Sequence, residues 1–153
     1  EIYMGDWSSD VCSSDLDTAR LAIAEPIVRT ARRIAVLGLS PNPDRASYEV
    51  AAYLQAAGYD IIPVRPDGHT ILGQPVVRDL RTASASGPID IVNVFRRREY
   101  LPEHLPDLLA AHPRLVWMQR GISDDTVAAA LENAGIAVVQ DRCLMVEHQH
   151  WGF

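Results

Sequence analysis

Residues able to bind phosphate gather in one short loop after the apolar run 34–37. Gly38 ends the run, and Ser40, Arg45 and Ser47 stand in the loop and at the start of the helical pattern that follows. A glycine lets a ligand approach the backbone closely, and the N–H groups at a helix N-terminus attract anions. Only Gly38 fits the G-x-G-x-x-G pattern of dinucleotide-binding loops. The loop therefore predicts either an anion site or a tight turn that leads into a capped helix.

Arginines follow two further apolar runs. Arg65 comes after Pro63 and Val64, at a place where nicotinamide enzymes usually carry an acidic residue for the ribose hydroxyls. A cation there suits a phosphorylated ribose, as in NADP or coenzyme A, and a solvated surface arginine is the alternative. Three consecutive arginines follow Phe95, and we expect one or two of them to face phosphates.

The last two apolar runs are followed by Gln119, Gly121 and Cys143. Cys143 has no cysteine nearby, so we interpret it as a small, half-buried residue rather than a nucleophile. His148 and His150 have the spacing of metal ligands on a strand. No thiol or acidic set of a zinc site accompanies them, so no metal site is predicted and they are interpreted as tail histidines.

These residues can meet only if the chain brings its apolar runs together in one sheet. Runs of the length and composition of buried parallel strands alternate with helical patterns. The alternation predicts an α/β fold of the Rossmann-like, three-layer, doubly wound type, with a mainly parallel sheet of about five strands and helices on both faces. Ligands bind such sheets beyond the carboxyl ends of the strands, where the residues above are expected to lie. The expected strands are 34–38, 59–64, 89–95, 115–118 and 136–139, and the expected helices are 46–57, 79–85, 100–111 and 123–133.

The length of 153 residues suits one domain, which we place at 17–150. Asp17 and Thr18 can cap its first helix, in which Pro26 is expected to mark a start or a kink. Residues 1–16 show no helical or strand period and repeat Ser-Ser-Asp, so we expect an appended segment or a natural disordered tail. Residues 151–153 are expected to be a tail outside the domain.

Composition excludes several classes of function. The formal net charge of −6 and the pI of about 5.2 argue against non-specific nucleic-acid binding. The sequence contains no run of about 18 apolar residues, so no membrane span is predicted. The two cysteines, Cys12 and Cys143, make no disulfide framework, and no secretory signal is evident, so a cytoplasmic location is expected.

Motifs at successive strand ends, taken in order, resemble the small CoA-binding domain proteins. This family is similar to the nucleotide-binding domain of the succinyl-CoA synthetase α-subunit. The resemblance implies a Rossmann-like fold with coenzyme A laid across the strand ends. The motifs are 34–48, 62–66, 71–76, 93–97, 117–121 and 141–143.

The resemblance also implies roles for single residues. Phosphates would be held by Gly38, Ser40, Arg45 and Ser47. The adenosine part would lie along Pro63, Val64 and Arg65. The pantetheine or diphosphate path would be flanked by Phe95, Arg96, Gln119, Gly121 and Cys143.

We therefore interpret the chain as a stand-alone binding or regulatory module for coenzyme A or an acyl-CoA, and more as a binding protein than as an enzyme. The alternative is an NADP-dependent reductase, or a CoA-transferring enzyme with a reactive Cys143. The missing second glycine of the fingerprint and the lack of an evident acid–base pair count against this alternative. A third hypothesis is an interaction subunit that only retains the fold. The protein partner and the oligomeric state stay open.

Overall fold

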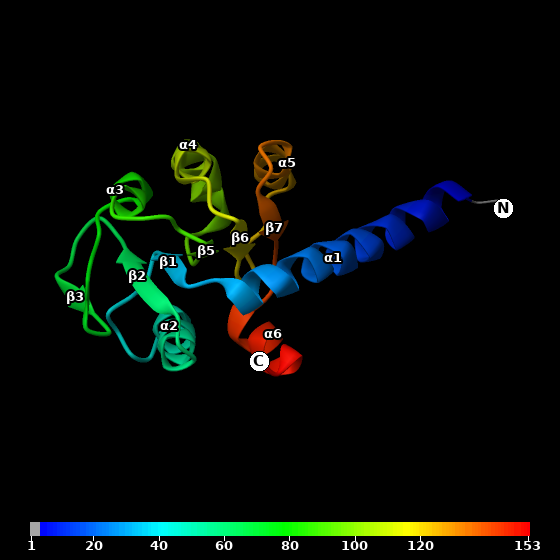
Figure 1. The fold of residues 1–153 in the computed structure, drawn as a ribbon. Helices are drawn as coiled ribbons and strands as arrows, with labels where there is room; N and C mark the ends of the chain where they lie inside the picture. Colours follow the sequence, from blue (N-terminus) through cyan, green and yellow to red (C-terminus); the bar gives the residue numbers. More distant parts are fainter. Residues whose placement is uncertain (1–3) are drawn as a thin grey trace.

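A five-stranded parallel sheet forms the middle layer of the molecule (Figure 1). The structure is a computed structural model that describes the backbone of residues 4–153 and the side chains from residue 15 onward. The strand order is β2-β1-β5-β6-β7, and every neighbouring pair is parallel. This arrangement confirms the predicted Rossmann-like α/β fold. The strands are β1 (Arg33–Leu37), β2 (Asp60–Val64), β5 (Ile91–Val94), β6 (Leu115–Met118) and β7 (Ala137–Val139).

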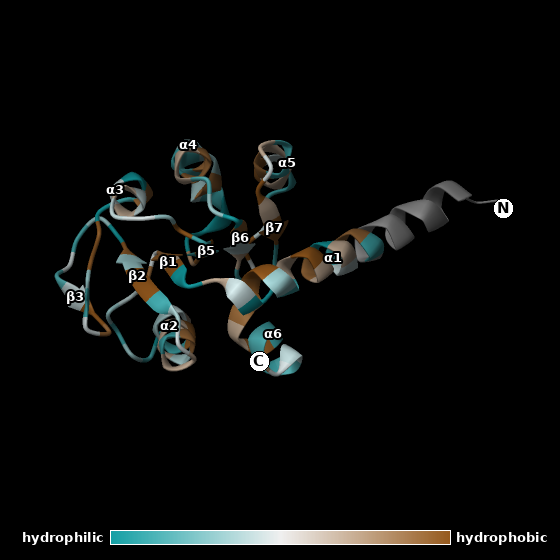
Figure 2. Cartoon of the chain, viewed as in Figure 1, coloured by the Kyte–Doolittle hydropathy of each residue, from teal (hydrophilic) through white to brown (hydrophobic). Residues whose placement is uncertain are grey.

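Helices cover both faces of the sheet. The helices α1 (Met4–Thr30), α2 (Ala46–Ala56) and α6 (Leu144–Trp151) lie on one face, and α3 (Leu80–Ala85), α4 (Leu101–Ala111) and α5 (Asp125–Asn133) lie on the other (Figure 1). Most of them carry hydrophobic and hydrophilic positions side by side, as amphipathic helices do (Figure 2). A small hairpin of β3 (Thr70–Ile71) and β4 (Gln74–Pro75) follows β2, and a 3₁₀ turn, η1 (Arg98–Tyr100), precedes α4.

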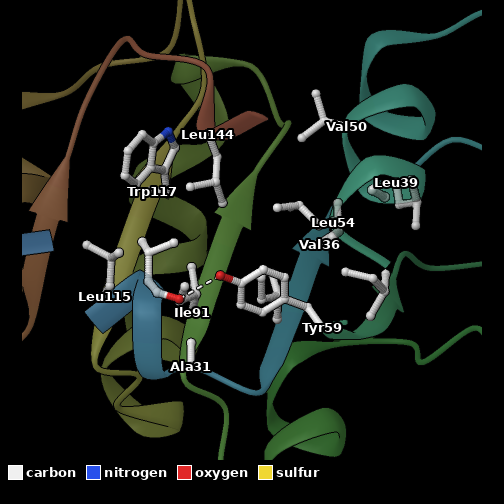
Figure 3. Packing of buried hydrophobic residues seen from close by; sticks show 14 of the residues in the cluster. Ala31, Val36, Leu39, Val50, Leu54, Tyr59, Ile91, Leu115, Trp117 and Leu144 are labelled. Carbon is white, nitrogen blue, oxygen red and sulfur yellow. Dashed lines mark hydrogen bonds between the residues drawn. The ribbon is translucent and has the colours of Figure 1, made fainter. Parts of the chain in front are cut away.

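One hydrophobic cluster fills the space between the sheet and α1, α2 and α6. Trp117 is fully buried there, and its indole N–H donates to the Arg142 carbonyl at 2.8 Å. The Tyr59 hydroxyl donates to the Val28 carbonyl at 2.6 Å and joins α1 to the sheet (Figure 3). Buried polar tips that keep a hydrogen-bond partner avoid the cost of an unsatisfied group. Trp117 is therefore a core residue.

The second cluster lies between the sheet and α3, α4 and α5. Leu80, Leu101, Leu108 and Leu131 are at most 1% exposed in this cluster. A local signal sets the start of α5, because the carboxylate of Asp124 accepts the Val127 N–H there.

The two chain ends differ from the sequence-based expectation. The first helix begins at Met4 rather than at Asp17, and Pro26 lies inside it without ending it. A helical backbone needs only its own i to i−4 hydrogen bonds, so it can continue through a stretch with no apolar period. Residues 1–3 and the side chain of Cys12 lie outside the described part, and the boundary at residue 16 stays a prediction.

The histidines near the C-terminus lie on helix α6, so their placement on a strand was wrong. His148 is buried, and its Nδ1 lies 2.8 Å from the Tyr53 hydroxyl. Trp151 ends α6 with its ring edge against Trp117, and Phe153 stacks on Trp151. Trp151, which the sequence analysis placed in a tail outside the domain, therefore packs against the first hydrophobic cluster.

The connections from β1 and β5 leave a crevice at one rim of the sheet. β1 pairs with β2 on one side and with β5 on the other, so the chain changes direction along the sheet between these neighbours. Such a switch point is where open α/β sheets bind ligands. Within the described part of the chain, no helix combines the length and the apolar character that crossing a bilayer requires.

Candidate functional site

A cavity of about 310 Å³ lies beyond the carboxyl ends of β1 and β2, beside the residues that follow β5. Its size is within the range of small-ligand pockets. Half of the residues predicted for the site line this first pocket. They are Gly38, Ser40, Arg45, Val64, Arg65 and Arg96.

The loop after β1 is held in shape by its own serines. The Ser47 hydroxyl accepts the Ser40 N–H at 3.0 Å, and the Ser40 hydroxyl accepts the Asn42 N–H at 3.1 Å. Ser47 is only 6% exposed and does not line the pocket. The hydroxyl of Ser47 thus shapes the loop. Arg45, the residue before α2, does not cap that helix with its side chain, so N–H groups of the first turn are left for an anion.

Arg65 is fixed by two anchors at the end of β2. Its guanidinium donates to the Leu39 carbonyl at 3.3 Å and, through Nε and Nη2, to the Asp67 carboxylate at 3.1 and 3.0 Å. The Arg65 side chain is 28% exposed, whereas that of Asp67 is 81% exposed. A pair with such an exposed carboxylate contributes little to stability, so the ion pair orients Arg65 more than it neutralises it.

Arg96 lies across Gly38. A Cβ atom at Gly38 would come within 3.1 Å of Cδ of Arg96 and within 3.2 Å of the Phe95 carbonyl oxygen, and Gly38 has a φ of +88°. The guanidinium of Arg96 lies over the Tyr100 ring, 4.7 Å from its centre. Its Nε is buried and has no hydrogen-bond partner among the described residues. A glycine is therefore required for Arg96 to reach the pocket by this route.

Helix α4 forms a wall of the pocket that sequence reasoning missed. His104 and Asp107 line it from two adjacent turns of α4. Burial, and after it the positive charge of Arg96, lower the pKa of His104 below its ordinary value, against the opposite effect of Glu103 and Asp107. His104 is therefore neutral near pH 7. The helical pattern could have placed both side chains beside the buried Leu101 and Leu108, but it could not show which sheet edge they face.

The first pocket concentrates positive charge in an acidic protein. Arg45, Arg65, Arg78 and Arg96 line it, against two carboxylates that each accept a hydrogen bond from a neighbouring residue. Asp79 caps α3 by accepting the Thr82 N–H at 2.8 Å, and Asp107 accepts from Nε of Arg81 at 2.6 Å. Arg78, which the sequence reasoning also missed, is 79% exposed at the pocket mouth. Such a set of guanidinium groups can bind phosphate or carboxylate groups.

A second, mostly apolar pocket of about 250 Å³ lies on the other side of the same rim. Phe95, Gln119 and Cys143, three of the predicted site residues, line it together with apolar residues that include Val50 and Ile122. Arg45 and Arg96 line the first pocket, and their chain neighbours Ala46 and Phe95 line the second. The two pockets are therefore adjacent.

Buried amides stand behind the second pocket. Gln119 is 4% exposed and donates from Nε2 to Oδ1 of Asn93 at 2.6 Å. Cys143 is a half-buried free thiol at the N-terminus of α6, where it packs against the first hydrophobic cluster. This environment agrees with its interpretation as a small, half-buried residue.

Two further predicted residues, Pro63 and Gly121, line neither pocket. Pro63 is buried in β2, and its carbonyl accepts the Val77 N–H at 2.8 Å. The Gly121 N–H donates to the Asp141 carboxylate at 2.6 Å, in a turn with φ of +85° at the glycine. Both residues therefore contribute backbone hydrogen bonds near the pockets without lining them. Among the described residues, no group of three or more His, Cys, Asp or Glu side chains is placed to hold a metal ion.

Comparisons with known proteins place this chain in a family. The fold is that of a Rossmann-like domain, with a pocket lined by four arginines at the carboxyl ends of its strands. Residues 32–149 match the family described as the CoA binding domain. The chain belongs to this CoA-binding-domain family.

Three relatives illustrate the likeness. The uncharacterized protein YneT of Bacillus subtilis (strain 168) is 42% identical over 122 residues, which cover 80% of this chain and 89% of YneT. The structure of cell-free ID.343 from Thermus thermophilus is 42% identical, with a TM-score of 0.78, and the match covers 82% of this chain and 93% of that one. A hypothetical protein from Pyrococcus horikoshii OT3 is 27% identical, with a TM-score of 0.77 and coverage of 86% and 90%.

Proposed function

We propose that the protein binds coenzyme A or an acyl-CoA in the rim pockets and acts as a stand-alone binding or regulatory module. The observation that carries this proposal is the set of four arginines that line one pocket at the switch point of the sheet. Coenzyme A offers several phosphate groups to such a set, including one on its ribose. Membership of the CoA-binding-domain family supports the same ligand.

The anionic half of the ligand fits the first pocket. Arg65, held at the end of β2, suits the ribose phosphate, while Arg45 and the first turn of α2 suit the diphosphate. Arg96 lines the same pocket, and its Nε–H, which has no partner among the described residues, gains one if a phosphate shifts the side chain.

The pantetheine arm fits the second pocket. That pocket is mostly apolar, and Gln119 adds an amide at its base. An arm with amide groups and an apolar chain needs this combination of surfaces. The thiol end of the arm would then point toward Cys143, which lines the same pocket.

Calorimetry with the purified protein tests the proposal. We expect coenzyme A to bind more tightly than NADP. The Arg65→Ala and Arg96→Ala variants should each weaken binding by roughly 1–3 kcal/mol, because each loses a charge-assisted contact with phosphate. Arg32→Ala is the matched control, since Arg32 is exposed just before β1, at the opposite edge of the sheet.

Two results would overturn the proposal. One is equal or absent heat with coenzyme A and NADP. The other is an Arg32→Ala variant that loses as much affinity as Arg65→Ala and Arg96→Ala, because a general loss of positive charge would then explain the binding. A scaffold that merely retains the fold should ignore the ligand in every variant.

A further inference from the structure

Asp107 is a carboxylate in a pocket built for anions. It lines the first pocket from α4, together with His104 one turn earlier, while the four arginines stand on the strand-end side and at the mouth. A phosphate placed against α4 would meet a negative charge. The part of the ligand that faces this wall must therefore carry hydrogen-bond donors rather than phosphate oxygens.

The position of Asp107 leaves it able to accept a further hydrogen bond. Nε of Arg81 donates to Oδ1 of Asp107 at 2.6 Å, and no other hydrogen bond to this carboxylate is found among the described side chains. A carboxylate has about four lone-pair sites on its two oxygens. Its side chain is 30% exposed, so it is accessible from the pocket side. Arg81 thus holds the carboxylate in place without saturating it.

The surroundings of Asp107 suit a flat aromatic base. Apolar residues also line the same pocket. Pro66 is exposed, while Leu37, Leu39, Val64 and Leu80 are at most 5% exposed. His104 adds an uncharged imidazole beside Asp107, because burial and Arg96 lower its pKa. A pocket that combines apolar residues with a carboxylate acceptor matches a purine that presents an amino group.

We propose that Asp107 selects adenine by accepting a hydrogen bond from its exocyclic amino group. Adenine carries an N6 amino donor at the position where guanine and hypoxanthine carry a carbonyl oxygen. A carboxylate attracts the first and repels the second. This role rests on the proposed function, because it assigns the base of the same ligand to the α4 side of the first pocket.

The test compares adenosine 3′,5′-bisphosphate with inosine 3′,5′-bisphosphate by calorimetry. The wild-type protein should prefer the adenosine compound by about tenfold or more, as expected for one hydrogen bond exchanged for a repulsive contact. In Asp107→Asn the preference should fall below about threefold, mainly because the inosine compound binds better to a carboxamide that can donate as well as accept. Glu103→Gln is the control, since Glu103 is exposed on the same helix and does not line the pocket.

Equal affinity of the wild-type protein for the two compounds overturns this role, whatever the variant does. An unchanged preference in Asp107→Asn, with thermal unfolding that shows a folded variant, overturns it as well. Coenzyme A titrated in parallel distinguishes a failure of the role of Asp107 from a failure of the proposed function. If coenzyme A binds while the base preference is absent, only the role of Asp107 fails; if neither the bisphosphates nor coenzyme A bind, the proposed function fails with it.

Discussion

Gly38→Ala should damage both stability and binding, and the reason lies in two separate features of this glycine. Its φ is +88°, a backbone conformation that an L-residue with a Cβ adopts only at a cost of about 1–2 kcal/mol. The new Cβ would also come within 3.1 Å of Cδ of Arg96 and 3.2 Å of the Phe95 carbonyl oxygen. The Phe95 backbone belongs to the end of the central sheet, so Arg96 has to move.

The chain offers a matched control for the first of these features. Gly58 has a φ of +108°, and an added Cβ there meets nothing within 4 Å. Gly58→Ala should therefore lower the free energy of unfolding by the backbone term alone, about 1–2 kcal/mol. Overpacking against Arg96 and Phe95 brings the expected loss in Gly38→Ala to about 2–4 kcal/mol. For a chain of this size these losses correspond to Tm decreases of roughly 3–6 °C and 6–12 °C.

Thermal unfolding and calorimetry with coenzyme A measure the two effects on the same samples. Gly38→Ala should bind at least about tenfold more weakly than the wild type, because Arg96 no longer lies at the pocket. Gly58→Ala should bind normally, since Gly58 lies at the end of α2 and lines neither pocket. Equal Tm decreases in the two variants, or normal binding by Gly38→Ala, would refute the placement of Arg96 over Gly38.

Two further predictions concern pH and stability. Burial lowers the pKa of His148, so this histidine binds protons more readily in the unfolded chain than in the folded one. The stability that neutral His148 contributes is complete above about pH 6.5 and is lost as the pH falls through the lower folded pKa. Thermal unfolding between about pH 7 and 5 should therefore show a smaller decrease in Tm for His148→Gln than for the wild type. For Asp90, burial raises the pKa, but hydrogen bonds from the backbone N–H groups of Arg32 and Arg33 at 2.9 and 3.0 Å, with the charge of Arg114, outweigh it and leave the pKa lowered. A lowered carboxyl pKa adds stability above about pH 4 that is lost in acid. Urea unfolding of Asp90→Asn should therefore show a free energy of unfolding about 1–2 kcal/mol lower at neutral pH, and this free energy should depend less on pH in the acid range. If the free energy of unfolding of the variant depends on pH in acid as that of the wild type does, this account is contradicted.

The strands and the rim were predictable because their physical signal is local. A strand buried on both faces must be an uninterrupted apolar run, and residues directly after parallel strands must share one edge of the sheet. Gly38, Arg65 and Arg96 come from three such positions, and all three line the first pocket. Knowing the strands was enough to bring them together.

The α4 wall was not predictable by the same reasoning. His104 and Asp107 reach the pocket only because of the rotation of α4 about its axis, which the packing of Leu101 and Leu108 against the sheet determines. A periodic pattern shows which face of a helix is buried, but it does not show what lies beside that face. Tertiary packing decides this, and a single sequence does not report it.

Serine hydroxyls illustrate a different kind of ambiguity. Ser40 and Ser47 stand where phosphate donors are expected, yet both hydroxyls accept backbone N–H groups within their own loop. Serine side chains commonly bond to nearby backbone, and such local bonds need the same residue types as a ligand site does. The short helix α6 was missed because an eight-residue segment with three apolar residues together at its start and no side-chain cap gives little helical signal.

Separate local features of the structure position the arginines of the first pocket. This arrangement argues for a binding role of the pocket. A positive-φ glycine leaves space for Arg96, a backbone carbonyl and an exposed carboxylate orient Arg65, and the start of α2 carries Arg45. Neither the Arg65–Asp67 pair nor the start of α2 stabilises the fold appreciably, because exposed ion pairs contribute little and no side chain caps that helix. Placing like charges around one cavity also raises the free energy of the folded state through mutual repulsion. This repulsion fits the proposed anionic ligand, which would compensate it on binding.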